Sequence, residues 1–332
     1  MDALFDSVML SRLQLAAMAM VHISFSVLTV GAALFIAVME GLWLKTKDPA
    51  WYGHARFWSR LLLLNFGIGV VTGLPLEFAF GNNWAPFAAK SAFFGEILGT
   101  ETLAAFMLEA GFLGVMVFGW NRVPPKLHFF STCMVVLGSA LSVFWIMVAN
   151  SWMQSPAGVT LDGGRIIVTD FREAIFNPDM VFSTAHMYVA CLQTSFLVVG
   201  GISAWYVLKG RHTAFFARSF QAALIASLVI APLQVWIGDE NGREVANLQP
   251  TKLAAMEAHW ETNPAGQGAS WIIAAWPDEA NQRNLWAVEV PYALSLLLTH
   301  SPTGEVKGLK DFPKDLHPPI LMTFYPFRVM VF

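Results

Sequence analysis

Six long apolar runs constrain the fold of this chain more than any other feature. They lie at about 14–43, 61–80, 93–119, 127–150, 181–208 and 216–237. A helix needs roughly 20 mainly apolar residues to cross the hydrocarbon core of a bilayer, and each run is at least that long. Since 56% of the 332 residues are apolar and 13% are charged, a soluble core could not bury so much apolar surface. The sequence therefore predicts an all-α fold, a polytopic transmembrane helix bundle.

We expect three segments along the chain. Residues 1–237 form the six-helix transmembrane bundle, 238–317 form a water-facing excursion, and 318–332 begin a seventh span. The stretch TKLAAMEAHWE in the excursion is typical of a short amphipathic helix. The last run, Pro319 to Phe332, would cover only ~21 Å as a helix, which is less than a bilayer core. We expect either an interfacial last element or a chain that stops within a span.

Lysine and arginine predict the orientation of the bundle. The loops and flanks after the first, third and fifth spans hold nine of these residues, whereas the opposite short loops hold three. Because short loops rich in Lys and Arg stay in the cytoplasm, the N-terminus and segment 238–317 are expected to face outward. The N-terminus carries Asp2 and Asp6 instead of a basic region, which favours an uncleaved first helix over a signal peptide.

Charge and cysteine content exclude several classes of protein. The net charge of −3 gives no basic face for nucleic acid. Cys133 and Cys191 lie in separate apolar runs, so they form neither a CxxCH haem-attachment motif nor a disulfide framework.

Ionisable residues inside apolar runs are costly in lipid and are usually functional. In the first run His22 is flanked at every fourth residue by Met18 and Ser26, so these side chains share one face of a helix. That face must contact protein, a cofactor or water. Two interpretations of His22 stay open. It is either a structural histidine that is hydrogen-bonded to a neighbouring helix or an axial ligand of haem iron.

The second and third runs add carboxylates. Glu77 ends a face that begins with the GxxxG pair Gly69 and Gly73, and it is compatible with a solvated boundary residue. Glu101 and Glu109 are eight residues apart, about 80° and ~12 Å along a helix, so they lie on nearly one face. This spacing favours a proton conduit, and the alternative is a buried hydrogen-bonded pair.

The remaining ionisable groups lie in the fifth and last runs. His186 is inside the fifth run, while Arg328 and Met330 are in the last. An arginine at membrane depth needs an anion, and a haem propionate is one such partner. Met330 alone would be core filler, but together with a histidine it would form a His/Met haem ligand set.

Long motifs place these residues in a family pattern. The motifs are SRLQ near Arg12, GxxTGLxxEFxFGxNW from Gly69 to Trp84, LxxFxLEAxFLG around Glu109, VANxWMQxP from Val148 to Pro156, GDExG from Gly238, TKLAAxExxWET from Thr251 and FRxMV from Phe327. With them the chain resembles subunit I of cytochrome bd-type quinol oxidases over essentially its whole length. Its short excursion is similar to the short Q-loop branch, which includes the cyanide-insensitive oxidases.

The resemblance implies haem cofactors and their ligands. His186 and Met330 correspond to the ligands of a low-spin haem b, with Arg328 beside it. His22 corresponds to a ligand of one of two active-site haems, which are a high-spin haem b and either haem d or a further haem b. Asn150 and Trp152 belong to the same family pattern.

The resemblance also implies the reaction. Lys252 and Glu257 correspond to quinol-site residues of a periplasmic Q loop, and Glu101 and Glu109 to carboxylates of a proton path. Ubiquinol or menaquinol would be oxidised at the periplasmic side, and O2 would be reduced to water with protons from the cytoplasm. The implied location is the bacterial inner membrane. The implied partners are subunit II and, in some members, a small single-span accessory subunit.

Two observations keep other interpretations open. The family carries a GWxxxExGRQPW motif in later spans, and its absence here predicts that the chain is the front part of a longer protein. Midspan carboxylates, together with Pro75 and Pro232 inside spans, would also suit a membrane transporter. A third interpretation is a haem-binding electron-transfer fragment without oxygen chemistry.

Overall fold

The computed structural model describes residues 6–332, which divide into two compact units. The bundle unit ends at Gln234, and the C-terminal unit comprises Val235–Phe332.

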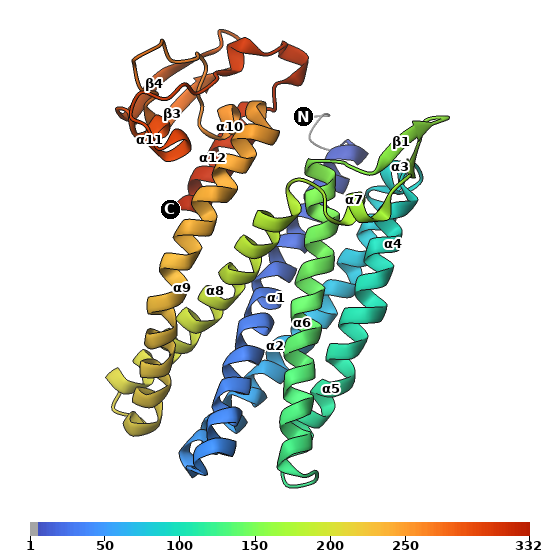
Figure 1. Cartoon of the computed structure of the whole chain (residues 1–332), viewed down its shortest axis with the longest axis vertical. Helices are drawn as coiled ribbons and strands as arrows, with labels where there is room; N and C mark the ends of the chain where they lie inside the picture. The colour runs from blue at the N-terminus through green and yellow to red at the C-terminus, as the bar shows by residue number, and fades with distance from the viewer. Residues whose placement is uncertain (1–5) are drawn as a thin grey trace. The chain divides into compact units, whose positions relative to one another are not determined.

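Within residues 6–332, six helices are long and apolar enough to cross a membrane. They are α1 (Ser7–Thr46), α2 (Pro49–Asn82), a third helix over Ala92–Phe118, α6 (Pro125–Gln154), α8 (Met180–Leu208) and α9 (Thr213–Leu248). The third consists of α4 (Ala92–Thr100), the π-helical segment Glu101–Phe106 and α5 (Met107–Phe118). Within the bundle unit α1 packs against α2, α6 and α8, and Figure 1 shows these helices running along one another. The predicted helical membrane fold is confirmed.

Local sequence signals explain where α1 ends and α2 begins. Lys47 takes a left-handed conformation with φ of 59°, which terminates α1. The Asp48 side chain then accepts a hydrogen bond from the backbone N–H of Ala50 at 2.8 Å, and Pro49 occupies the first turn of α2. An aspartate N-cap followed by proline is a strong helix start, so the two helices are joined by a tight connection.

Helix α9 extends further than its hydropathy indicates. The sequence predicted an end of the sixth span at 237, but α9 continues through charged residues to Leu248. Helix formation does not require apolar residues, whereas a residue before proline disfavours the helical conformation. Gln249, which precedes Pro250, accordingly has an extended φ of −137°. Proline therefore sets this boundary, and the loss of hydrophobicity does not.

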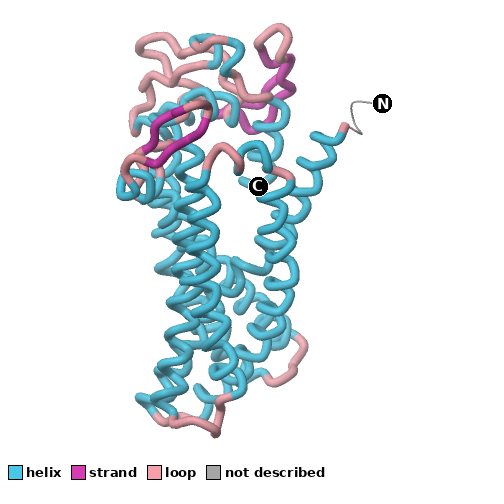
Figure 2. Tube along the Cα trace, turned by 90° about the vertical axis from the view of Figure 1, so that its right-hand side faces the viewer, coloured by secondary structure: helices cyan, strands magenta, loops and turns pink. Residues whose placement is uncertain are grey.

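Short elements complete both units. The bundle unit also contains α3 (Ala85–Ala88), α7 (Phe171–Ile175) and an antiparallel hairpin of β1 (Val159–Asp162) and β2 (Arg165–Val168). The C-terminal unit contains α10 (Pro250–Met256), an antiparallel hairpin of β3 (Trp271–Asp278) and β4 (Arg283–Val290), α11 (Ala293–Thr299), two 3-10 turns and α12 (Ile320–Val331). The hairpins, magenta in Figure 2, were not predicted from the sequence. Helix α12 lies within the last apolar run, and that this run begins a seventh span stays a prediction.

Close approach of α1 and α8 depends on a missing side chain. A Cβ added at Gly31 would lie 2.4 Å from Cβ of Ser195. At this contact the Ser195 hydroxyl lies 3.1 Å from the carbonyl oxygens of both Val27 and Leu28 on α1. Small residues at such interfaces let membrane helices pack backbone to backbone.

We therefore expect Gly31→Ala to destabilise the bundle by about 1–3 kcal/mol through overpacking. Gly67→Ala on α2 is the matched control, because an added Cβ there meets nothing within 4 Å. Thermal unfolding of the purified protein in detergent should give a lower midpoint for Gly31→Ala than for Gly67→Ala. Equal midpoints for both variants would show that the α1–α8 contact tolerates a methyl group.

Candidate functional site

His22 on α1 is held in a defined tautomer by α2. Its Nδ1 lies 3.2 Å from the hydroxyl of Thr72, and the backbone of Gly69 also bonds this side chain. The Thr72 hydroxyl is within donating distance of the carbonyls of Ile68, at 2.9 Å, and Gly69, at 3.1 Å. Because that hydroxyl has one proton, its oxygen is left to accept from Nδ1–H of His22. The lone pair of His22 then resides on Nε2.

This arrangement fits an iron ligand. Nδ1 of His22 contacts the Thr72 hydroxyl, and a histidine that donates one N–H to the protein is the usual form of a metal-ligating imidazole. A Cβ at Gly73 would lie 2.8 Å from Cε1 of His22, so this face of α2 admits the ring only because residue 73 is glycine. The Gly73 position of the GxxxG motif therefore accommodates His22.

Glu101 is positioned by an irregular turn. It opens the π-helical segment Glu101–Phe106, a type of helix widening that often occurs at functional sites. Its Oε1 accepts a hydrogen bond from the Ser142 hydroxyl of α6 at 2.5 Å. The next residue, Thr102, donates to Oε1 of Glu77 on α2 at 2.6 Å. Glu77, which the sequence left compatible with a solvated boundary position, thus joins the same polar group.

Glu109 is the most isolated of these carboxyls. It is 5% exposed, and its Oε1 has no hydrogen-bond partner within residues 6–332. Helices α5 and α6 touch closely here, because a Cβ added at Gly138 would lie 2.8 Å from Cβ of Glu109. Glu101 is bonded to Ser142 and interacts electrostatically with Glu109. Glu101 and Glu109 therefore interact electrostatically, as the two predicted carboxylates. Oε1 of Glu109 is free to take up a proton or to accept a hydrogen bond from a water.

The C-terminal unit brings Glu257 and Arg328 together. An Arg328 Nη2 donates to Oε2 of Glu257, and both side chains are less than 10% exposed. The guanidinium also lies 5.3 Å from the ring centre of Trp271. Burial raises the pKa of Glu257, while the adjacent guanidinium acts in the opposite direction. The anion that Arg328 requires is therefore supplied in this structure by a carboxylate 71 residues earlier in the chain.

Three further predicted site residues, Lys252, Met330 and His186, have other surroundings. The Lys252 amine donates to Oε1 of Gln249 at 2.9 Å within α10 and the residue before it. Met330 on α12 is 74% exposed, so its thioether is available to a ligand. His186 on α8 is partly buried, and no hydrogen bond to its ring occurs in the described part of the chain. His186 belongs to the bundle unit and Met330 to the C-terminal unit.

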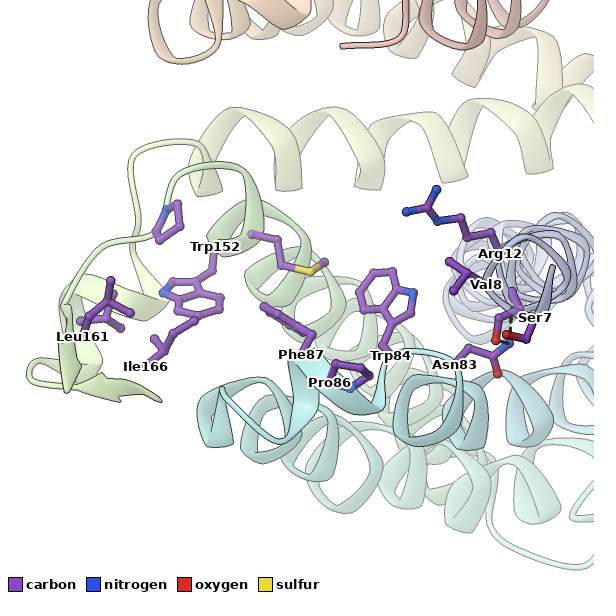
Figure 3. A pocket seen from close by; sticks show the side chains of 14 residues that line it. Ser7, Val8, Arg12, Asn83, Trp84, Pro86, Phe87, Trp152, Leu161 and Ile166 are labelled. Carbon is purple, nitrogen blue, oxygen red and sulfur yellow. Dashed lines mark hydrogen bonds between the residues drawn. The ribbon is translucent and has the colours of Figure 1, made fainter. Parts of the chain in front are cut away.

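An apolar pocket in the bundle unit collects residues from three of the sequence motifs. Its volume is about 910 Å³, and Figure 3 shows Arg12, Trp84 and Trp152 on its walls. These residues come from the start of α1, the turn after α2 and the end of α6. Asn83 beside them donates to the Ser11 carbonyl at 2.8 Å, which ties the end of α2 to the start of α1. The motifs thus converge in space although they are far apart in sequence.

Comparison with known families decides the relationship. The family model described as "Cytochrome bd terminal oxidase subunit I" matches residues 10–332. The chain belongs to this family. Subunit 1 of the Escherichia coli cytochrome bd-II ubiquinol oxidase is 38% identical over 318 residues, which are 95% of this chain and 62% of that protein. Subunit 1 of the Bacillus subtilis cytochrome bd ubiquinol oxidase is 37% identical over 340 residues, an alignment that covers 98% of this chain and 71% of that protein.

A solved structure agrees with the family assignment. The chain matches the bd oxidase from Geobacillus thermodenitrificans with a TM-score of 0.89 at 32% identity, covering 98% of this chain and 75% of that one. The bd-family resemblance predicted from the motifs is therefore confirmed. The chain spans about two thirds of the length of the curated relatives that it matches.

This bd-family chain also contains a buried pair that the sequence analysis missed. Glu40 of α1 is fully buried, and its Oε1 lies 2.6 Å from Nδ1 of His128 on α6. Its Oε2 accepts from the Thr132 hydroxyl at 2.6 Å. The Trp120 ring lies 3.9 Å from the imidazole, centre to centre. Glu40 lies in the first apolar run, so the rule that selected His22 would also have selected it.

Removing one partner of this pair should destabilise the protein. We expect His128→Phe to cost about 1–3 kcal/mol, because one Glu40 oxygen would stay buried without a donor. The control is His300→Phe, since the His300–Asp239 pair is substantially exposed and should contribute at most about 1 kcal/mol. Thermal unfolding in detergent should show a clearly lower midpoint for His128→Phe. A midpoint no lower than that of His300→Phe would contradict the assigned role of the pair.

Proposed function

We propose that this chain is the haem-binding subunit of a membrane-bound quinol:oxygen oxidoreductase. The observation that carries the proposal is the position of His22, whose Nδ1 contacts the Thr72 hydroxyl and whose ring packs on Gly73 of α2, an arrangement that would present Nε2 to a haem iron. A transporter would not need an imidazole prepared in this way, whereas a haem ligand does. The ubiquinol oxidase subunits to which the chain is similar support the same reaction.

We assign the ligands as follows. His186 and Met330 would hold the iron of a low-spin haem b, and His22 would hold that of one of two active-site haems, a high-spin haem b and a haem d or further haem b. When bound, haem supplies the one-electron transfers and the reduction of O2. The protein's part is to fix the tautomer of His22 through Thr72 and to keep the surrounding helices closely packed.

The C-terminal unit would bind quinol. Ubiquinol or menaquinol carries two hydroxyl groups, and each must lose a proton when the quinol is oxidised. Glu257 is suited to accept such a proton because burial raises its pKa, and Arg328 stabilises the carboxylate when the proton leaves. Lys252, on the adjacent helix α10, would hold a quinol oxygen by hydrogen bonding. Proton release toward the periplasm follows from the Q-loop orientation that the lysines and arginines of the loops predict.

The bundle unit would supply protons for the reduction of O2. Glu109 has a free buried oxygen, and Glu101 is bonded to Ser142, so each can hold a proton in a region without bulk water. We propose that protons from the cytoplasm pass from Glu109 to Glu101. Uptake and release on opposite sides would then build a membrane potential.

The exposed surface of the bundle unit fits a multi-subunit complex in the bacterial inner membrane. Large apolar side chains project from α2 and α9, such as Val71, Phe78 and Val229, each at least 70% exposed. Lipid tails or another apolar helical subunit would cover such surfaces. We propose subunit II of the oxidase as the principal partner, together with a small single-span accessory subunit.

Oxygen uptake with two electron donors tests this function. In membranes containing the complete oxidase, Glu257→Gln should lower quinol-driven oxygen uptake by about 100-fold, because the proton acceptor is lost. Uptake driven by an artificial one-electron donor should stay within about twofold, because that donor releases no hydroxyl proton at this site.

Glu261→Gln is the matched control, since Glu261 is exposed and pairs only with Lys310 among the described side chains. It should leave both rates unchanged. Equal loss with both donors in Glu257→Gln would point to a structural role for the Glu257–Arg328 pair. Absence of quinol-driven uptake in the unmodified oxidase would overturn the proposed function itself.

A further inference from the structure

We propose that Glu77 extends the carboxylate group of Glu101 and Glu109 and is its proton-holding residue nearest to His22, with the Thr102 hydroxyl as the relay between Glu101 and Glu77. This inference rests on the function proposed above, in which Glu109 and Glu101 carry protons. It adds a residue and a direction to that path.

The contacts form a continuous polar connection between two helices. Thr102 donates from the π-helical segment to Oε1 of Glu77 on α2 at 2.6 Å, and the same side chain interacts with Glu101. Glu101 in turn accepts from Ser142 of α6 at 2.5 Å. The π-helical segment begins at Glu101. Glu101 and Thr102, its first two residues, thus both contact side chains on other helices.

The surroundings of Glu77 are not those of a solvated boundary carboxylate. Its hydrogen-bond partner is a hydroxyl, and across residues 6–332 no cation forms an ion pair with Glu77 or Glu101. The side chain is partly buried, and it interacts electrostatically with Glu101. Glu77 and Glu101 are therefore neighbouring carboxyls for which the described residues supply no ion-pair partner.

Helix geometry places Glu77 toward the proposed haem ligand. Gly73 and Glu77 are four residues apart, so they lie on one face of α2 with about 6 Å between them along the axis. Gly73 is the residue on which the His22 ring packs. The order along the path is therefore Glu109, Glu101, Thr102 and Glu77, and the last member is one helical turn from the contact with His22.

The transfer itself balances without any further reactant. Thr102 passes its hydroxyl proton to the Glu77 carboxylate and takes the proton of the Glu101 carboxylic acid. Glu77 is then protonated, Glu101 is a carboxylate that still accepts from Ser142, and the threonine is restored. No electron moves in this step.

Paired variants in the complete oxidase test the inference. Glu77→Gln and Thr102→Val should each slow quinol-driven oxygen uptake by about 100-fold, with unchanged haem content, because proton delivery becomes rate-limiting. The ratio of rates in H2O and D2O should rise for the same reason. Thr102→Ser keeps the hydroxyl and should restore both values. The controls are Glu96→Gln, at an exposed residue, and Thr100→Val, at a partly buried residue whose hydroxyl donates only to the Glu96 carbonyl among the described residues; both should match the unmodified oxidase.

The outcomes separate this inference from the proposed function. If the unmodified oxidase is active and Glu77→Gln and Thr102→Val keep its rate and its isotope ratio, the relay is wrong while the oxidase function stands. If Thr102→Ser is as slow as Thr102→Val, the hydroxyl is not the relay, which also overturns the inference. If Glu77→Gln loses haem, the oxygen-uptake rates of the two Thr102 variants test the relay instead. A slow Thr102→Val with a normal Thr102→Ser supports it, and equal rates overturn it. An unmodified complex without quinol-driven uptake overturns both proposals.

Discussion

The exclusion of water from the bilayer core governs the bundle unit. A charged or polar side chain there must find its partner on another helix, because lipid offers none. Glu40 meets His128 and Thr132 in this way, and Glu101 meets Ser142. These contacts join α1 and the π-helical segment Glu101–Phe106 with α6, so they fix which helices are neighbours. Glu109, whose Oε1 lacks any partner in the described part of the chain, is the exception, and an unsatisfied buried carboxyl is costly enough to call for a functional explanation.

The sequence predicts the helices well because membrane thickness sets their length and apolar composition marks them. It also identifies His22, Glu101 and Glu109, since ionisable residues in apolar runs are rare. It does not predict where α9 ends, because charged residues can continue a helix until Pro250 interrupts it. Hydrophobicity marks the part of a helix that can lie in lipid, but a helix can continue beyond that part. It therefore predicts spans more reliably than helix ends.

Hydropathy and helix periodicity do not predict which side chains from distant segments form hydrogen bonds or ion pairs. Glu77 is compatible with a boundary residue until Thr102 is seen beside it, and Arg328 could take any anion until Glu257 is found 71 residues earlier. The hairpin of β1 and β2 escapes prediction for a related reason, because strands of four residues carry little pattern and depend on pairing. The tautomer of His22 likewise depends on bonds that Thr72 makes to its own helix.

The central claim is that this member of the cytochrome bd subunit I family binds haem through its own histidines. Reduced-minus-oxidised absorption spectra of the purified oxidase, with haem quantified as the pyridine haemochrome, test it most directly. We expect b-type haem in the unmodified complex and loss of the low-spin b signal in His186→Ala, with the other haem signals retained. A complex without haem, or a His186→Ala spectrum identical to that of the unmodified oxidase, would contradict the account.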